Sequence, residues 1–314
     1  MSIKEFKTLL KSTFKSMDTE ENIDIYFTRP IGLCITLICK RLGIHPNAVT
    51  ISSMFFGAGA GWMFLHTDLV HNICGVLLLM LANFCDSADG QLARMTGKTS
   101  LIGRMLDGFA SDVWFFFVYV AICLRLYNEN IPGTEIRWGL YVWLLCIAAG
   151  VLAHARQCRL ADYYRNIHLF FLLGKKGSEL DSYESQKALA DKYRDEKNLT
   201  GVLFFYNYAK YCKAQERITL GFQALKSELI SRYGSLDNVP QEFRDEFRKG
   251  SLPLMKYTNF LTHNWRAITL FVGCLVNMPW IYPVFELTVM MAVYLYMHYR
   301  HETLCNNLRL RWHA

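Results

Sequence analysis

The sequence predicts an all-α membrane protein with six transmembrane helices, an amphipathic N-terminal segment and a helical insertion. Hydrophobic residues make up 52% of the 314 positions, and they gather in long stretches. Each stretch is near the roughly 20 residues that a helix needs to cross a bilayer. Aromatic residues account for 14% of the chain, which is typical of proteins that place rings at membrane interfaces.

Six apolar stretches are candidates for the transmembrane helices. Lysine and arginine gather in the segments after the second, fourth and sixth stretches, and cytoplasmic loops carry such an excess. We therefore expect both termini and the loop between the second and third helices to be cytoplasmic, in a bacterial inner (cytoplasmic) membrane. The six stretches are 47–66, 69–92, 103–125, 136–158, 263–279 and 281–300.

The N-terminal region, residues 1–45, is predicted to lie at the membrane surface. Its first turns place apolar residues on one helical face and lysines on the other, a pattern typical of helices that bind anionic lipid. An ordinary solvated amphipathic helix is the alternative. The apolar face holds Ile3, Phe6, Leu10 and Phe14, and the basic face holds Lys4, Lys7, Lys11 and Lys15.

The remaining chain divides into three parts. Residues 46–165 hold the first four spans, residues 166–260 form a charged cytoplasmic helical insertion, and residues 261–314 hold the last two spans and a tail. The net charge of +7 is spread over loops and chain ends. This spread argues against nucleic acid as a partner and favours anionic lipid headgroups or phosphorylated substrates. The ten cysteines show no metal-type spacing and are expected to be free thiols.

Four aspartates stand out because they flank the predicted turn between the second and third spans. Asp86 and Asp89 are three residues apart and share one helical face, and Asp107 and Asp112 follow on the next helix. Such carboxylates would repel one another unless a cation lay between them, and hard oxygen ligands favour Mg²⁺, Mn²⁺ or Ca²⁺. Solvated helix caps are the alternative structural interpretation.

These residues resemble the signature of the CDP-alcohol phosphatidyltransferases. The matching pattern is Asp86-x-x-Asp89-Gly90-x-x-Ala93-Arg94, eight further residues, and Gly103-x-x-x-Asp107. The resemblance implies a homodimeric membrane enzyme of phospholipid biosynthesis, similar to phosphatidylinositol-phosphate synthases. It implies transfer of a phosphatidyl group from CDP-diacylglycerol to an alcohol, with release of CMP.

The same resemblance implies roles for individual residues. The cofactor would be Mg²⁺ or Mn²⁺, held by Asp86, Asp89, Asp107 and Asp112. Residues that would bind the nucleotide donor are Asn47, Thr50, Asp86, Gly90, Ala93, Arg94 and Gly103.

The sequence departs from the family where a fourth aspartate, the catalytic base, should follow Asp107 by four residues. Ser111 occupies that position and Asp112 comes next. On a regular helix Ser111 lies about 40° and Asp112 about 140° from Asp107. A π-bulge, which we favour, would return Asp112 to the site as the base. Otherwise Ser111 faces the site, the base is missing and catalysis is weak.

Arginines near the same cavity indicate the acceptor. Arg156, Arg159 and Arg266 are candidates to bind a phosphorylated alcohol, because guanidinium groups bind phosphate in a bidentate way. Inositol phosphate is the first choice and glycerol 3-phosphate, as in phosphatidylglycerophosphate synthases, the second. Free inositol, serine, or an aminoalcohol phosphotransferase reaction follow. A catalytically weak scaffold or a divalent-cation transporter is the alternative of another class.

Overall fold

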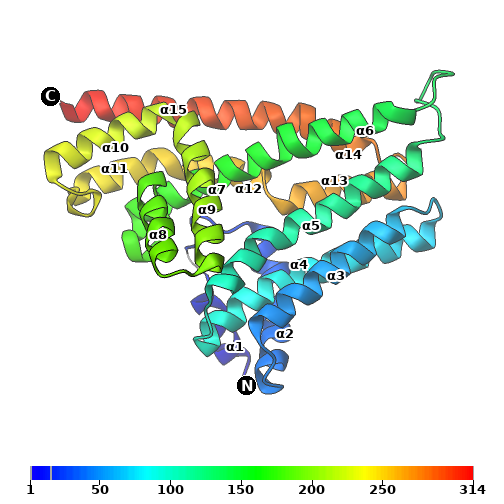
Figure 1. Cartoon of the computed structure of the whole chain (residues 1–314), viewed down its shortest axis with the longest axis horizontal. Helices are drawn as coiled ribbons and strands as arrows, with labels where there is room; N and C mark the ends of the chain where they lie inside the picture. Colours follow the sequence, from blue (N-terminus) through cyan, green and yellow to red (C-terminus); the bar gives the residue numbers. More distant parts are fainter. Residues whose placement is uncertain (1, 15, 314) are drawn as a thin grey trace. The chain divides into compact units, whose positions relative to one another are not determined.

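The computed structural model describes residues 2–14 and 16–313, and these form helices joined by short loops (Figure 1). Within them the only extended pairing is an isolated bridge between Asn130 and Arg137. This confirms the all-α prediction. The helices are α1 (Ile3–Ser12), α2 (Arg29–Arg41), α3 (Pro46–Phe64), α4 (Leu69–Thr96), α5 (Leu101–Leu126), α6 (Gly139–Ile147), α7 (Ala155–Leu173), α8 (Tyr183–Asp195), α9 (Leu199–Ile218), α10 (Leu220–Tyr233), α11 (Gln241–Ser251), α12 (Met255–Phe260), α13 (His263–Leu275), α14 (Ile281–Phe285) and α15 (Met291–His313).

Three π-helical segments interrupt or extend these helices. The segment η2 (Ala148–His154) joins α6 to α7, and η6 (Glu286–Met290) joins α14 to α15. The third, η1 (Asp24–Thr28), leads into α2. Single-turn π segments are rare and occur often at functional sites.

The protein is membrane-embedded, since four helices among the described residues are long and apolar enough to cross a bilayer. These are Leu69–Thr96, Leu101–Leu126, the continuous helix Gly139–Leu173, and Ile281–Trp312. The helix α13 covers the fifth predicted span, but its 13 residues extend only about 20 Å. That length is shorter than a typical hydrocarbon core of about 30 Å. The six-span topology therefore stays a prediction.

The chain forms two compact units. The first unit comprises residues 20–156 and 263–291 together with α1, and the second comprises residues 16–19, 157–262 and 292–314. The segment 166–260 is helical, as expected, and its status as a separate insertion stays a prediction.

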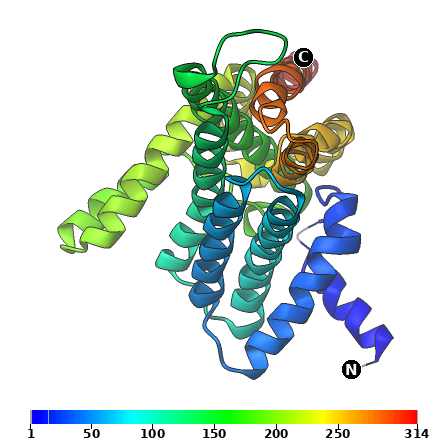
Figure 2. The ribbon, with the colours of Figure 1, turned by 90° about the vertical axis from the view of Figure 1, so that its right-hand side faces the viewer.

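The first unit is built around α3, which packs against α4 and α5; Figure 2 shows α3 and α4 side by side. Glycines permit this close approach. A Cβ atom at Gly57 would lie 2.1 Å from the Trp114 side chain, and one at Gly61 would lie 2.7 Å from Phe117 Cβ. Both distances are below any normal contact, so neither site accepts a larger residue without movement of α5. Gly59 is different, because its nearest neighbour, Leu78, is at an ordinary 3.5 Å.

The N-terminal helix α1 begins with a capping box, in which the Glu5 amide donates to Ser2 Oγ and the Ser2 amide donates to Glu5 Oε2. None of its described residues is buried. On its apolar face Ile3 is exposed, and Phe6 and Leu10 are half-buried. The role at a membrane surface stays a prediction. Lys15 lies outside the described residues.

The second unit packs α8 against α9 and surrounds a cluster of buried phenylalanines that includes Phe222, Phe243 and Phe247. Asp18 joins this unit through Arg248, whose Nε donates to Asp18 Oδ2 at 2.7 Å. This hydrogen bond holds the pKa of Asp18 below its ordinary value. The stabilisation is therefore present above the unfolded pKa of Asp18 and is lost only as the pH falls through the lower, folded value.

Candidate active site

Asp89 and Asp107 lie at similar distances from the turn between α4 and α5, each measured along its own helix. Helix α4 ends at Thr96, and Gly97 adopts the left-handed φ of +67° that favours glycine. Ser100 then caps α5, since its Oγ accepts a hydrogen bond from the Gly103 amide at 2.9 Å. At 1.5 Å per residue, Asp89 lies about 10 Å and Asp107 about 9 Å along their helices from this turn.

Asp86, Asp89 and Asp107 are brought together, as the sequence predicts. One carboxylate oxygen of each lies within 4.8 Å of the others. Asp86 and Asp89 share a face of α4, and Asp107 reaches them from α5. Three carboxylates this close repel one another, so the arrangement favours a bound cation.

The helix α3 supports this cluster from the other side. Thr50 and Asp89 are only 2% and 3% exposed, and the Thr50 hydroxyl donates a hydrogen bond to Asp89 Oδ2. Hydrogen bonds of this kind orient a carboxylate that binds metal. The structure thus gives Thr50 a contact with a predicted metal ligand.

The predicted nucleotide-binding residues lie in the N-terminal parts of α3 and α5 and in the C-terminal half of α4. A Cβ atom at Gly103 would lie 2.8 Å from Asn47 Oδ1, so the glycine lets the start of α3 approach α5 closely. A Cβ atom at Gly90 would lie 3.5 Å from Arg94 Nη1, which places the guanidinium beside that glycine. Ala93, which stands between Gly90 and Arg94 in the sequence, is half-buried. Their part in binding a nucleotide stays a prediction.

The donor set fits a hard divalent cation. Octahedral Mg²⁺ binds oxygen at about 2.0–2.1 Å, so its ligand oxygens lie about 3 Å apart when adjacent and about 4 Å apart when opposite. The separation of at most 4.8 Å among the three carboxylates needs only a small closure to reach these values. Asp86, Asp89 and Asp107 would be the residues that hold the ion.

The expected π-bulge in α5 is wrong. The helix is α-helical without interruption from Leu101 to Leu126. Asp112 therefore points about 140° away from Asp107, and it lines a different cavity of about 340 Å³ together with Phe115, Tyr119 and His154. Ser111 occupies the direction nearer Asp107. Asp112 is not part of the carboxylate cluster.

Arg266 lies in a buried polar network inside the first unit. Arg266 and Glu286 are both fully buried and form an ion pair. His154 Nδ1 lies 3.1 Å from Glu286 Oε1, and the Tyr282 hydroxyl donates to the same oxygen at 2.9 Å. The Tyr119 hydroxyl donates to Glu286 Oε2. This pairing gives Arg266 a structural partner besides any acceptor phosphate.

Two π-helical segments bring this network together. His154 is the last residue of η2, and Glu286 is the first residue of η6. The sequence alone does not pair either residue with Arg266. The signal was nonetheless present, because a carboxylate within an apolar span needs a cationic or hydrogen-bonding partner nearby.

The other two predicted acceptor-binding arginines lie on α7. Arg156 is exposed and belongs to the first unit. Arg159 belongs to the second unit, where its guanidinium lies 5.5 Å from the centre of the Tyr211 ring. Their binding of a phosphorylated acceptor stays a prediction.

Replacing Glu286 is expected to destabilise the protein strongly. Glu286→Gln keeps the shape of the side chain but leaves the charge of Arg266 uncompensated, which costs about 3–5 kcal/mol for a buried pair. Thermal unfolding in detergent should show a much lower midpoint than in the wild type. Val289→Ala, a change at a 46%-exposed residue of the same π segment, is the control. Equal midpoints for the two variants would contradict the importance of the pair.

Comparison with known proteins assigns the segment that contains the aspartate cluster. Residues 43–167 match the family model for CDP-alcohol phosphatidyltransferase. This confirms the family resemblance that the aspartate motif predicts, for residues 43–167.

Among individual proteins, the chain is similar to the archaetidylinositol phosphate synthase of Pyrococcus horikoshii. The two are 30% identical over 118 residues, which cover 38% of this chain and 56% of the relative. The chain thus spans little more than half of the relative's length. The family as a whole depends on divalent cations, in agreement with the carboxylate cluster.

Proposed function

We propose that this protein is a membrane phosphatidyltransferase of phospholipid biosynthesis. It transfers a phosphatidyl group from CDP-diacylglycerol to a phosphorylated alcohol and releases CMP. The observation that carries the proposal is the convergence of Asp86, Asp89 and Asp107 within 4.8 Å in a domain of the matching family. The metal would be Mg²⁺ or Mn²⁺.

The residues of the site divide the work of this reaction. Asp86, Asp89 and Asp107 hold the cation, and Thr50 orients Asp89. When bound, the cation would offset the negative charge that develops on the diphosphate oxygens. Gly90 leaves space beside the Arg94 guanidinium, where a phosphate of the donor can approach the α4 backbone.

Proton transfer is the weak step of this site. The acceptor hydroxyl must lose a proton when it attacks phosphorus, and a positioned base contributes on the order of 10²–10⁴ in rate. Ser111 stands where the family has that base, and the regular geometry of α5 directs Asp112 elsewhere. We therefore expect slow turnover, and the regular helix favours this over the bulged alternative.

Inositol phosphate is the proposed acceptor. The similarity to an archaetidylinositol phosphate synthase supports it, and so does the presence of Arg156 and Arg159 on α7. Arg266 is a weaker candidate, because Glu286 already neutralises its charge. Phosphatidylglycerophosphate synthesis from glycerol 3-phosphate is the next candidate within the family.

The proposed setting is a homodimer in a bacterial inner membrane, with the aspartate cluster and both termini on the cytoplasmic side. The placement of lysine and arginine in the loops supports this orientation. The exposed amphipathic helix α1 would lie on the anionic cytoplasmic surface.

A panel of acceptors tests the reaction. Purified protein in detergent is given Mn²⁺, CDP-diacylglycerol and one acceptor at a time, and CMP is measured. We expect release with inositol phosphate and little with glycerol 3-phosphate, inositol or serine. Release with a different acceptor would replace the proposed substrate. If no acceptor releases CMP above the level of Asp89→Asn, the proposed activity is wrong.

A further inference from the structure

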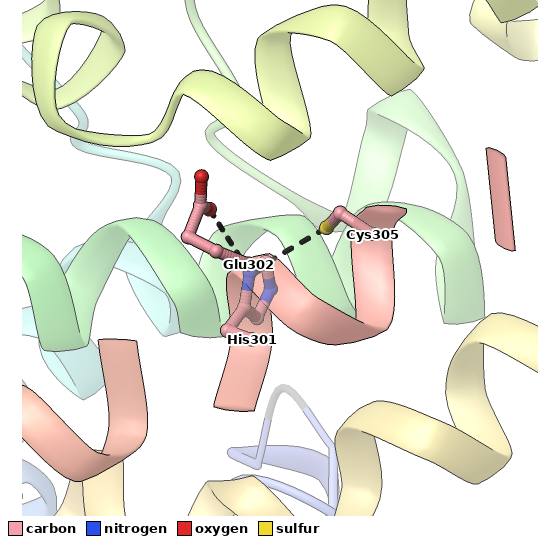
Figure 3. A group of neighbouring side chains, drawn as sticks. All are labelled: His301, Glu302 and Cys305. Carbon is pink, nitrogen blue, oxygen red and sulfur yellow. Dashed lines mark hydrogen bonds and ion pairs between the residues drawn. The ribbon is translucent and has the colours of Figure 1, made fainter. Parts of the chain in front are cut away.

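We propose that His301, Glu302 and Cys305 form a zinc site in the second unit. One ligand atom from each residue lies within 4.8 Å of the others. Figure 3 shows the Glu302 carboxylate and the Cys305 sulfur beside the His301 ring on α15. This site is separate from the aspartate cluster and does not depend on the proposed function.

The distances fit a shared metal ion. His301 Nδ1 lies 3.6 Å from Cys305 Sγ and 3.7 Å from Glu302 Oε1. Zinc binds nitrogen or oxygen near 2.0–2.1 Å and sulfur near 2.3 Å, so tetrahedral ligand atoms lie about 3.3–3.6 Å apart. An N–H···O hydrogen bond would need about 2.7–3.2 Å. The nitrogen–oxygen distance is therefore too long for a hydrogen bond but close to the spacing of two zinc ligands.

The protonation states allow a shared cation. If Nδ1 carries a lone pair, it can accept from the Cys305 thiol, while Glu302 Oε1 accepts from Tyr164 rather than from His301. If Nδ1 carries a hydrogen, the thiol loses its acceptor within the group. A cation bound by the Nδ1 lone pair, the carboxylate and the thiolate satisfies all three at once. Binding releases the thiol proton to solvent.

Neighbouring groups hold the ligands in place. The Tyr164 ring stacks on the His301 imidazole with centroids 3.7 Å apart, and the Tyr164 hydroxyl donates to Glu302 Oε1 at 3.3 Å. The Gly221 amide donates to Glu302 Oε2 at 2.5 Å. Partners of this kind orient metal ligands. The site would thereby fasten α15 to α7 and α10.

The donor set and its burial select zinc over the hard cations. His301 and Cys305 are fully buried, and imidazole nitrogen with thiolate sulfur favours zinc, whereas Mg²⁺ prefers oxygen alone. Three protein ligands leave the fourth position of a tetrahedral zinc ion open. Water can supply a fourth ligand.

Cobalt spectroscopy tests the site without reference to enzyme activity. The full chain, purified in detergent and stripped with EDTA, is titrated with Co²⁺ in excess Mg²⁺, which occupies the carboxylate cluster. We expect a thiolate-to-cobalt charge-transfer band that saturates at one equivalent and disappears when one equivalent of Zn²⁺ is added. Cys305→Ser should lose the band. Cys212→Ser, which changes a buried cysteine of the same unit, should keep it.

Two outcomes would overturn the proposal. One is a wild-type protein without the band, a result that does not depend on how any variant folds. The other is a Cys305→Ser protein that keeps the band and the one-to-one zinc content measured by elemental analysis. Thermal unfolding supplies a second readout, because Zn²⁺ should raise the midpoint of the wild type but not that of Cys305→Ser.

Discussion

Asp89→Asn is expected to lower CMP release by about a hundredfold to a thousandfold. The variant keeps the size of the side chain and can still accept the Thr50 hydrogen bond, but it removes one of three negative charges that attract the cation. Losing a metal ion that stabilises transition-state charge costs several kcal/mol, and each 1.36 kcal/mol is tenfold in rate. Asp86→Asn and Asp107→Asn should behave alike, since all three belong to one cluster.

Asp68→Asn provides the matched control for these variants. Asp68 caps the opposite end of α4, where its side chain accepts from the His71 amide. Asparagine also caps helices well, so this variant should retain wild-type CMP release. Raising the Mn²⁺ concentration should partly restore Asp89→Asn by mass action. If Asp89→Asn released CMP at the wild-type rate, the cluster would not be the site of catalysis.

Ser111→Asp is expected to raise turnover by about tenfold or more. The substitution returns a carboxylate to the position four residues after Asp107, on the side of α5 nearer the cluster. General bases contribute on the order of 10²–10⁴ in rate, and a base introduced without its supporting contacts should recover part of that. The measurement is the initial rate of CMP release at saturating donor and acceptor.

Two further variants separate this account from the bulged helix. Asp112→Asn and Ser111→Ala should each retain most of the wild-type activity, because the regular α5 directs Asp112 into the cavity beside His154. A large loss in Asp112→Asn, with no gain in Ser111→Asp, would show that Asp112 acts as the base.

The aspartate cluster was predictable because its determinants are local in the sequence. Asp86 and Asp89 are one helical turn apart, and the short turn between α4 and α5 leaves Asp107 little freedom of position. The close helix contacts at Gly57 and Gly61 were predictable for the same reason: small residues in apolar helices favour close packing.

The remaining features depend on contacts between distant segments or on small changes of helical geometry. The pairing of Arg266 with Glu286 follows from η6, and no propensity scale marks that segment as π-helical. A bulge in α5 would relieve the cost of burying Asp112 in an apolar span, but a place at the edge of a cavity relieves that cost as well. His301 and Cys305 lie in one turn of α15, yet Tyr164 and Gly221, which orient Glu302, come from α7 and α10.

Anomalous diffraction from crystals grown with Mn²⁺ is the most direct test of the central claim. We predict a strong anomalous peak within bonding distance of carboxylate oxygens from Asp86, Asp89 and Asp107, and its disappearance in crystals of Asp89→Asn. A map with no peak beside these three aspartates would contradict the claim that they hold the catalytic cation.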